Sequence, residues 1–228
     1  MNYDLYNREE RYTCSHLFRL LHEPAESYRP LREFLKRSVS PGAFRIYAEV
    51  ALIRDAYHAR KPHAAPFMDD LVRLLMRQEA VPQCRLYSEL PEELSDGSKT
   101  HPNQIRKKAG DLLTPGESRV YGAMQGMFNA KPDLAVCLED EVILYEAKLT
   151  LDFDAQQLKR TRNIGEVWAN LLYADLGYKK PPNLRVLKLG LAKFSPDVSW
   201  EEVSKIADAT YGEPDRTRLA LAIARSIT

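Results

Sequence analysis

Three charged side chains interrupt two apolar runs in the stretch PDLAVCLEDEVILYEAKL, residues 132–149. Asp133 opens the first run, and Glu146 and Lys148 stand two residues apart near the end of the second. Charges inside an apolar strand are costly unless they are paired or bound to a metal ion. Carboxylate oxygens suit Mg²⁺ or Mn²⁺, and a neighbouring ammonium can position a water or stabilise negative charge on a phosphate. These residue types therefore favour metal-assisted chemistry on a phosphate ester.

A β-hairpin is predicted to position these side chains. Short runs rich in Val, Ile, Leu, Cys and Tyr cover 131–138 and 141–151, and Glu139-Asp140 forms a tight connection between them. Successive side chains of a strand point to opposite faces, so Glu146 and Lys148 share one face while Ala147 lies on the other. The hairpin is expected to bring the start of the first strand, with its aspartate, near that face.

The elements around the hairpin alternate between helices and strands. Before it we expect helices over 7–22, 31–37, 43–60 and 65–79, and a candidate strand over 84–90. After it we expect a helix over 154–176 with Asp154 as N-cap, a strand over 184–194, a helix over 199–209 opened by a Ser199/Glu202 capping box, and a last helix from 213. This order predicts an α/β fold with a mixed central β-sheet flanked by helices.

The hairpin resembles the PD-(D/E)xK nuclease superfamily. Pro132-Asp133 matches the "PD" and Glu146-Ala147-Lys148 the "(D/E)xK". Gln157-Leu158-Lys159-Arg160 resembles the Gln-Leu-x-Arg element that some subfamilies carry on the following helix. The N-terminal segment REERYTCSHLFRLLHEP, residues 8–24, is loosely similar to the opening helix of one such subfamily.

The resemblance implies a restriction-endonuclease-like core, with extra N-terminal and C-terminal helices, that hydrolyses phosphodiester bonds with a divalent metal. Asp133, Glu146 and the backbone carbonyl of Ala147 would hold Mg²⁺ or Mn²⁺. Lys148 would orient the attacking water. The metal would lower the pKa of bound water and neutralise charge on the phosphate.

Two further residues receive roles only through the resemblance. Gln157 would help to fix Lys148, the water or a phosphate. Glu10 would be an extra carboxylate and metal ligand donated by the first helix, with Glu9 as the alternative. An acidic first turn is also ordinary compensation of a helix dipole.

Basic residues give candidate contacts to nucleic acid. Lys159, Arg160 and Arg162 follow the hairpin on the predicted helix and could contact phosphates, although a charge run is more often a solvated helix face. The same two interpretations apply to 106–108, Arg-Lys-Lys, inside an irregular excursion. DNA is the expected substrate, RNA is the alternative, and a homodimer or a partner protein is compatible with the sequence.

Composition narrows the class of protein. Lys and Arg number 33 against 32 Asp and Glu, which argues against coating nucleic acid by bulk charge and leaves room for a local basic cleft. No apolar run approaches the ~20 residues needed to cross a bilayer, and the polar N-terminus does not resemble a signal peptide. Three scattered cysteines (Cys14, Cys84 and Cys137) favour reduced thiols and a cytoplasmic location.

The length favours one domain over 1–228. We expect its core in 1–22 and 83–194, a helical elaboration over 31–80, an irregular excursion over 91–118, and C-terminal helices over 199–228. The alternative to an enzyme is a nuclease-fold nucleic-acid-binding or scaffold protein without activity of its own, because a D…ExK pattern also arises by chance as surface charges.

Overall fold

The computed structural model describes residues 10–149, 152–212 and 215–225. The chain divides into two compact units. The sheet unit comprises 1–49, 132–165 and 182–228, and the helical unit comprises 50–131 and 166–181. Because 83–131 belongs to the helical unit, the expected core segment 83–194 is divided between the two units. The physical reason is that helices of 50–131 bury apolar side chains against one another and form a core of their own.

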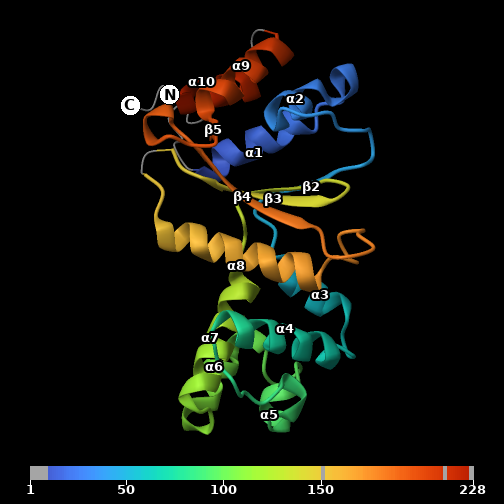
Figure 1. The fold of residues 1–228 in the computed structure, drawn as a ribbon, viewed down its shortest axis with the longest axis vertical. Helices are drawn as coiled ribbons and strands as arrows, with labels where there is room; N and C mark the ends of the chain where they lie inside the picture. The colour runs from blue at the N-terminus through green and yellow to red at the C-terminus, as the bar shows by residue number, and fades with distance from the viewer. Residues whose placement is uncertain (1–9, 150–151, 213–214, 226–228) are drawn as a thin grey trace. The chain divides into compact units, whose positions relative to one another are not determined.

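A five-stranded mixed sheet forms the centre of the sheet unit (Figure 1). Its strands, in spatial as well as chain order, are β1 (Arg45–Tyr47), β2 (Leu134–Cys137), β3 (Glu141–Ala147), β4 (Asn183–Gly190) and β5 (Val198–Ser199). Strands β1, β2 and β3 pair antiparallel, whereas β3, β4 and β5 pair parallel. The predicted α/β class with a mixed sheet is confirmed, and so is the predicted hairpin.

Helices cover both faces of this sheet, as Figure 1 shows. One face carries α1 (Glu10–Leu21), α2 (Ala25–Leu35), α9 (Trp200–Thr210) and α10 (Arg216–Arg225), and the other carries α8 (Ala155–Leu171). Leu17, Val136, Ile143 and Trp200 are at most 1% exposed in the core between the first group and the sheet. The Ser199/Glu202 capping box that opens α9 is confirmed.

The helix expected over 43–60 is wrong in its first part. Arg45–Tyr47 is the edge strand β1, and only Leu52–Ala59 is helical, as α3. Pairing with β2 provides hydrogen bonds for this short segment, and the burial of Ile46 against the core adds apolar contact. Strand formation here depends on a partner that is remote in the sequence, so a local helical period is overridden. The strand expected over 184–194 also ends earlier, at Gly190.

The helical unit differs more from expectation. Its elements are α3, α4 (Ala65–Gln78), η2 (Tyr87–Glu89), α5 (Glu92–Ser95), η3 (Pro102–Gln104), α6 (Ile105–Ala109), η4 (Gly110–Leu112) and α7 (Pro115–Asn129). The candidate strand over 84–90 is wrong, since that segment holds the 3₁₀ turn η2. Helix α7 was not expected, although its start carries a clear signal: Thr114 and Glu117 form a capping box around Pro115.

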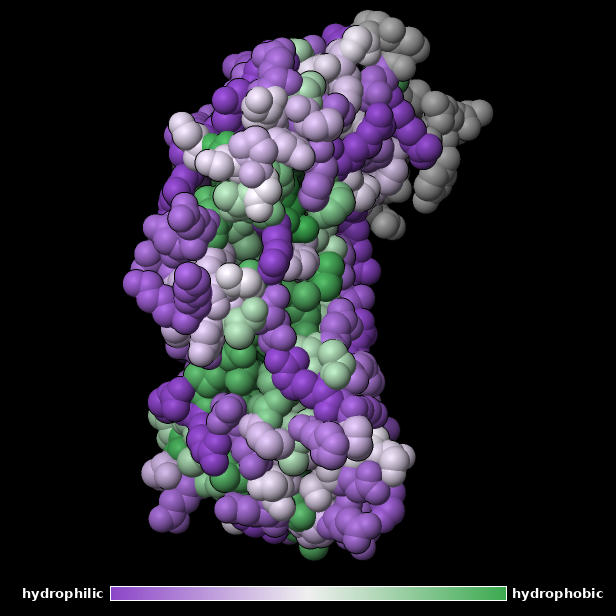
Figure 2. Space-filling view, turned by 90° about the vertical axis from the view of Figure 1, so that its right-hand side faces the viewer, coloured by the Kyte–Doolittle hydropathy of each residue, from purple (hydrophilic) through white to green (hydrophobic). Residues whose placement is uncertain are grey.

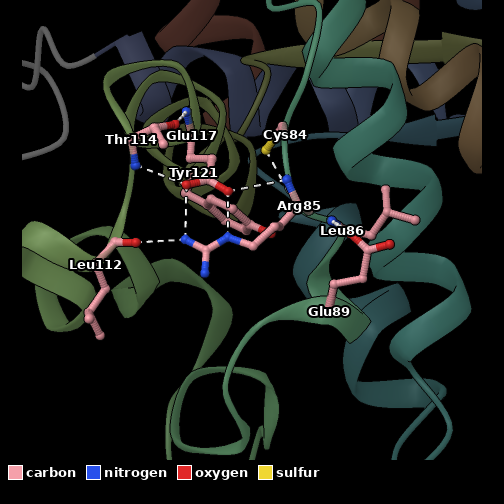
Figure 3. Close-up of polar contacts among 8 residues, drawn as sticks. All are labelled: Cys84, Arg85, Leu86, Glu89, Leu112, Thr114, Glu117 and Tyr121. Atoms are coloured by element: carbon pink, nitrogen blue, oxygen red, sulfur yellow. Dashed lines mark hydrogen bonds and ion pairs between the residues drawn. The ribbon is translucent and has the colours of Figure 1, made fainter.

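An ion pair between Arg85 and Glu117 connects the segment before η2 to α7 (Figure 3). Arg85 Nε lies 2.6 Å from Glu117 Oε1, and Arg85 Nη2 lies 2.9 Å from Oε2. The backbone N–H groups of Arg85 and Thr114 donate to the same carboxylate, whose side chain is only 5% exposed. Hydrogen bonding to Arg85 lowers the pKa of Glu117 to about 2.

The Glu117→Gln variant is expected to lose about 2 kcal/mol of unfolding free energy at neutral pH, because it leaves the Arg85 guanidinium without its charge partner. A carboxylate with a lowered pKa stabilises the fold above its unfolded pKa, so the difference from wild type should shrink as the pH falls from about 4.5 towards 2. Urea unfolding at neutral and acidic pH measures both effects. Glu92→Gln, at an exposed ion pair with Lys99, is the control and should change stability little. Equal stability of Glu117→Gln and this control at neutral pH would contradict the assignment.

No helix within the described part of the chain is long and apolar enough to cross a membrane. On the face drawn in Figure 2, hydrophobic residues gather in groups that hydrophilic residues surround. Among the described residues the large apolar side chains that are exposed are Leu112 and Leu219.

Candidate functional site

Asp133 lies at the start of β2, where the hairpin holds it beside the end of β3. The register pairs Leu134 with Tyr145, which places Asp133 across from Glu146. Its Oδ2 accepts a hydrogen bond of 2.8 Å from the backbone N–H of Ala147. The hairpin therefore brings Asp133 to the end of β3, as the sequence predicts.

The environment of Asp133 disfavours its charged form. Its pKa is raised to about 7, mainly by burial and also by the nearby charges of Glu146, Glu10 and Glu49, against the opposing effect of the Ala147 N–H. Four carboxyl groups thus gather in one region of the sheet unit. A bound cation would favour the charged form of this buried carboxyl group, which burial and its acidic neighbours disfavour.

Glu146 is buried on the face of the sheet that α8 covers, with 6% of its surface exposed. Gln157 Nε2 donates a hydrogen bond to Glu146 Oε1. Thr161 Oγ1 donates one of 2.6 Å to Oε2. Side chains from the first two turns of α8 therefore hold both oxygens of this carboxylate. Gln157 contacts Glu146, whereas the resemblance implied a role in fixing Lys148, the water or a phosphate.

The Lys148 ammonium lies between two carboxylates. Its Nζ is 3.6 Å from Glu146 Oε1 and 3.4 Å from Glu10 Oε2, and only 11% of its side chain is exposed. The backbone on both sides is fixed as well: the Lys148 N–H donates to Leu189 O, and its carbonyl accepts from Trp200 Nε1. The expectation that Glu146 and Lys148 share a face is confirmed.

Glu10 reaches the site from the first residue of α1, whereas Glu9, the alternative, lies outside the described residues. Glu49 is a site residue that sequence reasoning missed. Its N–H donates to Pro132 O at 3.1 Å, directly before Asp133, and its carboxylate lies 3.4 Å from Arg11 Nε. Its φ of +55° is unusual for a residue other than glycine.

These residues offer oxygen ligands for a divalent cation. In the described part of the chain no three His, Cys, Asp or Glu side chains are arranged to hold a metal ion. The set that the resemblance implies is Asp133, Glu146, the Ala147 carbonyl and Glu10, of which Glu10 and Glu146 also lie beside the Lys148 ammonium. One or two carboxylates, completed by water, are the ligands that Mg²⁺ takes in proteins. The uncompensated charge around Asp133 fits such a cation.

Cys14 is a buried neighbour of this site on α1, 1% exposed. Burial raises the pKa of its thiol well above the ordinary value, and the charges of Asp133 and Glu10 add to the effect. The raised pKa favours the protonated thiol at neutral pH. Its position agrees with a packed core residue.

The candidate nucleic-acid contacts are solvent-exposed. Lys159, Arg160 and Arg162 lie on α8 in the sheet unit, next to the residues that hold Glu146. None of the three forms an ion pair with another described residue. The basic residues 106–108 belong to α6 of the helical unit, where Lys108 donates to the Lys99 carbonyl.

Comparison with known proteins finds no family model, no curated protein and no solved structure that matches this chain.

Proposed function

We propose that this protein is a divalent-metal-dependent nuclease that hydrolyses phosphodiester bonds of DNA, and that its sheet unit is a restriction-endonuclease-like core. The observation that carries the proposal is the meeting of Asp133, Glu146 and Lys148 at the adjoining ends of β2 and β3. Lys148 Nζ lies 3.6 Å from Glu146 Oε1, and Asp133, whose pKa is raised mainly by burial, lies across from Glu146. This arrangement suits a cation and a phosphate together.

In this proposal the carboxylates bind the metal ion and Lys148 acts on the water or the phosphate. Asp133 and Glu146, with the carbonyl of Ala147, would hold Mg²⁺ or Mn²⁺. The bound ion supplies a lowered pKa for the attacking water and neutralisation of charge on the phosphate. Lys148 Nζ, held by Glu10 and Glu146, can donate a hydrogen bond to the water or to a phosphate oxygen as negative charge develops there.

A panel of nucleic acids tests this function. Linear and circular duplex DNA, single-stranded DNA and RNA are incubated with the protein and Mg²⁺ or Mn²⁺, with EDTA as one control and Glu146→Gln as the other. We expect cleavage of at least one DNA substrate, lost in both controls. Cleavage of RNA alone would overturn DNA as the substrate. Binding of DNA and Mn²⁺ without any cleavage would overturn the enzyme and favour the scaffold alternative.

The exposed cations of α8 would contact phosphates near the site. In the cleavage-deficient Glu146→Gln background with Mg²⁺ present, adding Arg160→Gln and Arg162→Gln should weaken DNA binding. Each lost contact should lower the slope of log affinity against log salt by about 1. Fluorescence anisotropy at several salt concentrations measures this slope. Lys205→Gln, an exposed change on α9, serves as the matched control, and an unchanged slope in both arginine variants would refute the phosphate contacts.

A further inference from the structure

We propose that Thr161 is a positioning residue, which holds the Glu146 carboxylate in the orientation that binds a divalent cation. The inference rests on the proposed function and extends it to a side chain outside the matched motif. Thr161 is 4% exposed, and its hydroxyl donates a 2.6 Å hydrogen bond to Glu146 Oε2. A carboxylate only accepts hydrogen bonds when ionised, so the hydroxyl proton must point at Glu146.

Two side chains of α8 each donate a hydrogen bond to one oxygen of the Glu146 carboxylate. Residues four apart in a helix lie on the same side, one turn above the other, so Gln157 and Thr161 both face β3. Gln157 takes Oε1 and Thr161 takes Oε2, and the rotation of the carboxylate is fixed from both ends. Each oxygen has further lone pairs and can still bind a cation.

A glycine one turn further along α8 lies close to side chains of the sheet. A Cβ atom on Gly165 would lie 2.5 Å from Leu184 Cδ1 and 3.0 Å from Leu144 Cδ1, so an alanine there would require these leucine side chains to shift. Gln157, Thr161 and Gly165 are spaced four residues apart and lie on one side of α8, the side that faces the sheet.

Outer hydrogen bonds to a ligating carboxylate fix its orientation, and their loss typically weakens metal binding by roughly 10- to 100-fold. The test compares Thr161→Val, which keeps the shape and loses the hydroxyl, with Thr161→Ser, which keeps the hydroxyl. Mn²⁺ affinity is measured by calorimetry or thermal-shift titration on the full chain without nucleic acid. We expect Thr161→Val to bind Mn²⁺ about 10-fold more weakly than wild type, with Thr161→Ser close to wild type.

A purely structural role would change the melting temperature and leave the Mn²⁺ affinity alone, so the affinity separates the two roles. Wild-type affinity in Thr161→Val, or equal weakening in the Val and Ser variants, would overturn the positioning role. If the wild-type protein binds Mn²⁺ and cleaves no nucleic acid, the nuclease function fails while the affinities still decide the role of Thr161. If the wild-type protein binds no Mn²⁺, both proposals fall.

Discussion

The Lys148→Met variant is expected to lose about 10²- to 10³-fold in the rate of DNA cleavage while it keeps its fold and its Mn²⁺ affinity. Methionine preserves the apolar stem that packs in this largely buried position and removes the charge. The variant then lacks the donor beside the scissile phosphate, so the loss should fall on the turnover rate rather than on the Michaelis constant. Single-turnover cleavage with saturating Mn²⁺ measures it directly.

Two comparisons make this prediction specific. Lys193→Met alters an exposed lysine in the same unit, and it should cleave like wild type. Far-ultraviolet circular dichroism and thermal melting of Lys148→Met establish that it is folded, a necessary check because the substitution removes the cation that pairs with Glu10 and Glu146. A folded, Mn²⁺-binding Lys148→Met variant that cleaves within a few-fold of wild type would refute the role given to this ammonium.

The Asp133→Asn variant is expected to be more stable than wild type without metal above neutral pH, and inactive. The folded pKa of about 7 lies above the unfolded value near 3.8. Between these values the unfolded chain loses its proton while the folded chain keeps it, so this group reduces stability progressively as the pH rises, and the full cost remains above 7. Asparagine has no charge to bury and can still accept from the Ala147 N–H.

We expect a gain of about 2 kcal/mol at about pH 8, after allowance for the partial exposure of this carboxyl, and little difference below about pH 4. Denaturant unfolding with EDTA across this range gives the measurement. Saturating Mn²⁺ should stabilise the wild-type protein and leave the variant almost unchanged, because the variant lacks the Asp133 carboxylate that would bind the ion. Asp140→Asn, exposed in the hairpin turn, is the control. An Asp133→Asn variant less stable than wild type at pH 8 would show that the carboxylate supports the fold instead.

The charge balance of the whole chain, 33 against 32, does not describe the site. Asp133, Glu146, Glu10 and Glu49 concentrate negative charge around one lysine, a region that a bare phosphate would avoid. A bound divalent cation inverts the sign of such a region. The proposed activity should therefore depend on metal for substrate binding as well as for chemistry.

The hairpin could be predicted from the sequence because its information is local. Alternation with a period of two places Glu146 and Lys148 on one face, and a tight connection brings Asp133 back beside them. The capping box at Ser199 is equally local and is correctly predicted. The start of α7 carries a signal of the same local kind, the capping box of Thr114 and Glu117.

Other features depend on segments that are distant in the chain. Glu49 reaches the site because β1 pairs with β2 and the Glu49 N–H bonds to Pro132 O, and nothing within the local sequence reveals that pairing. Thr161 contacts Glu146 because α8 packs against the sheet with this side facing β3. The sequence by itself determined the charged motif, its shared face and the α/β class, since these follow from backbone periodicity. Only the tertiary structure decided which further side chains complete the site and how the chain divides into two units, because long-range packing selects those contacts.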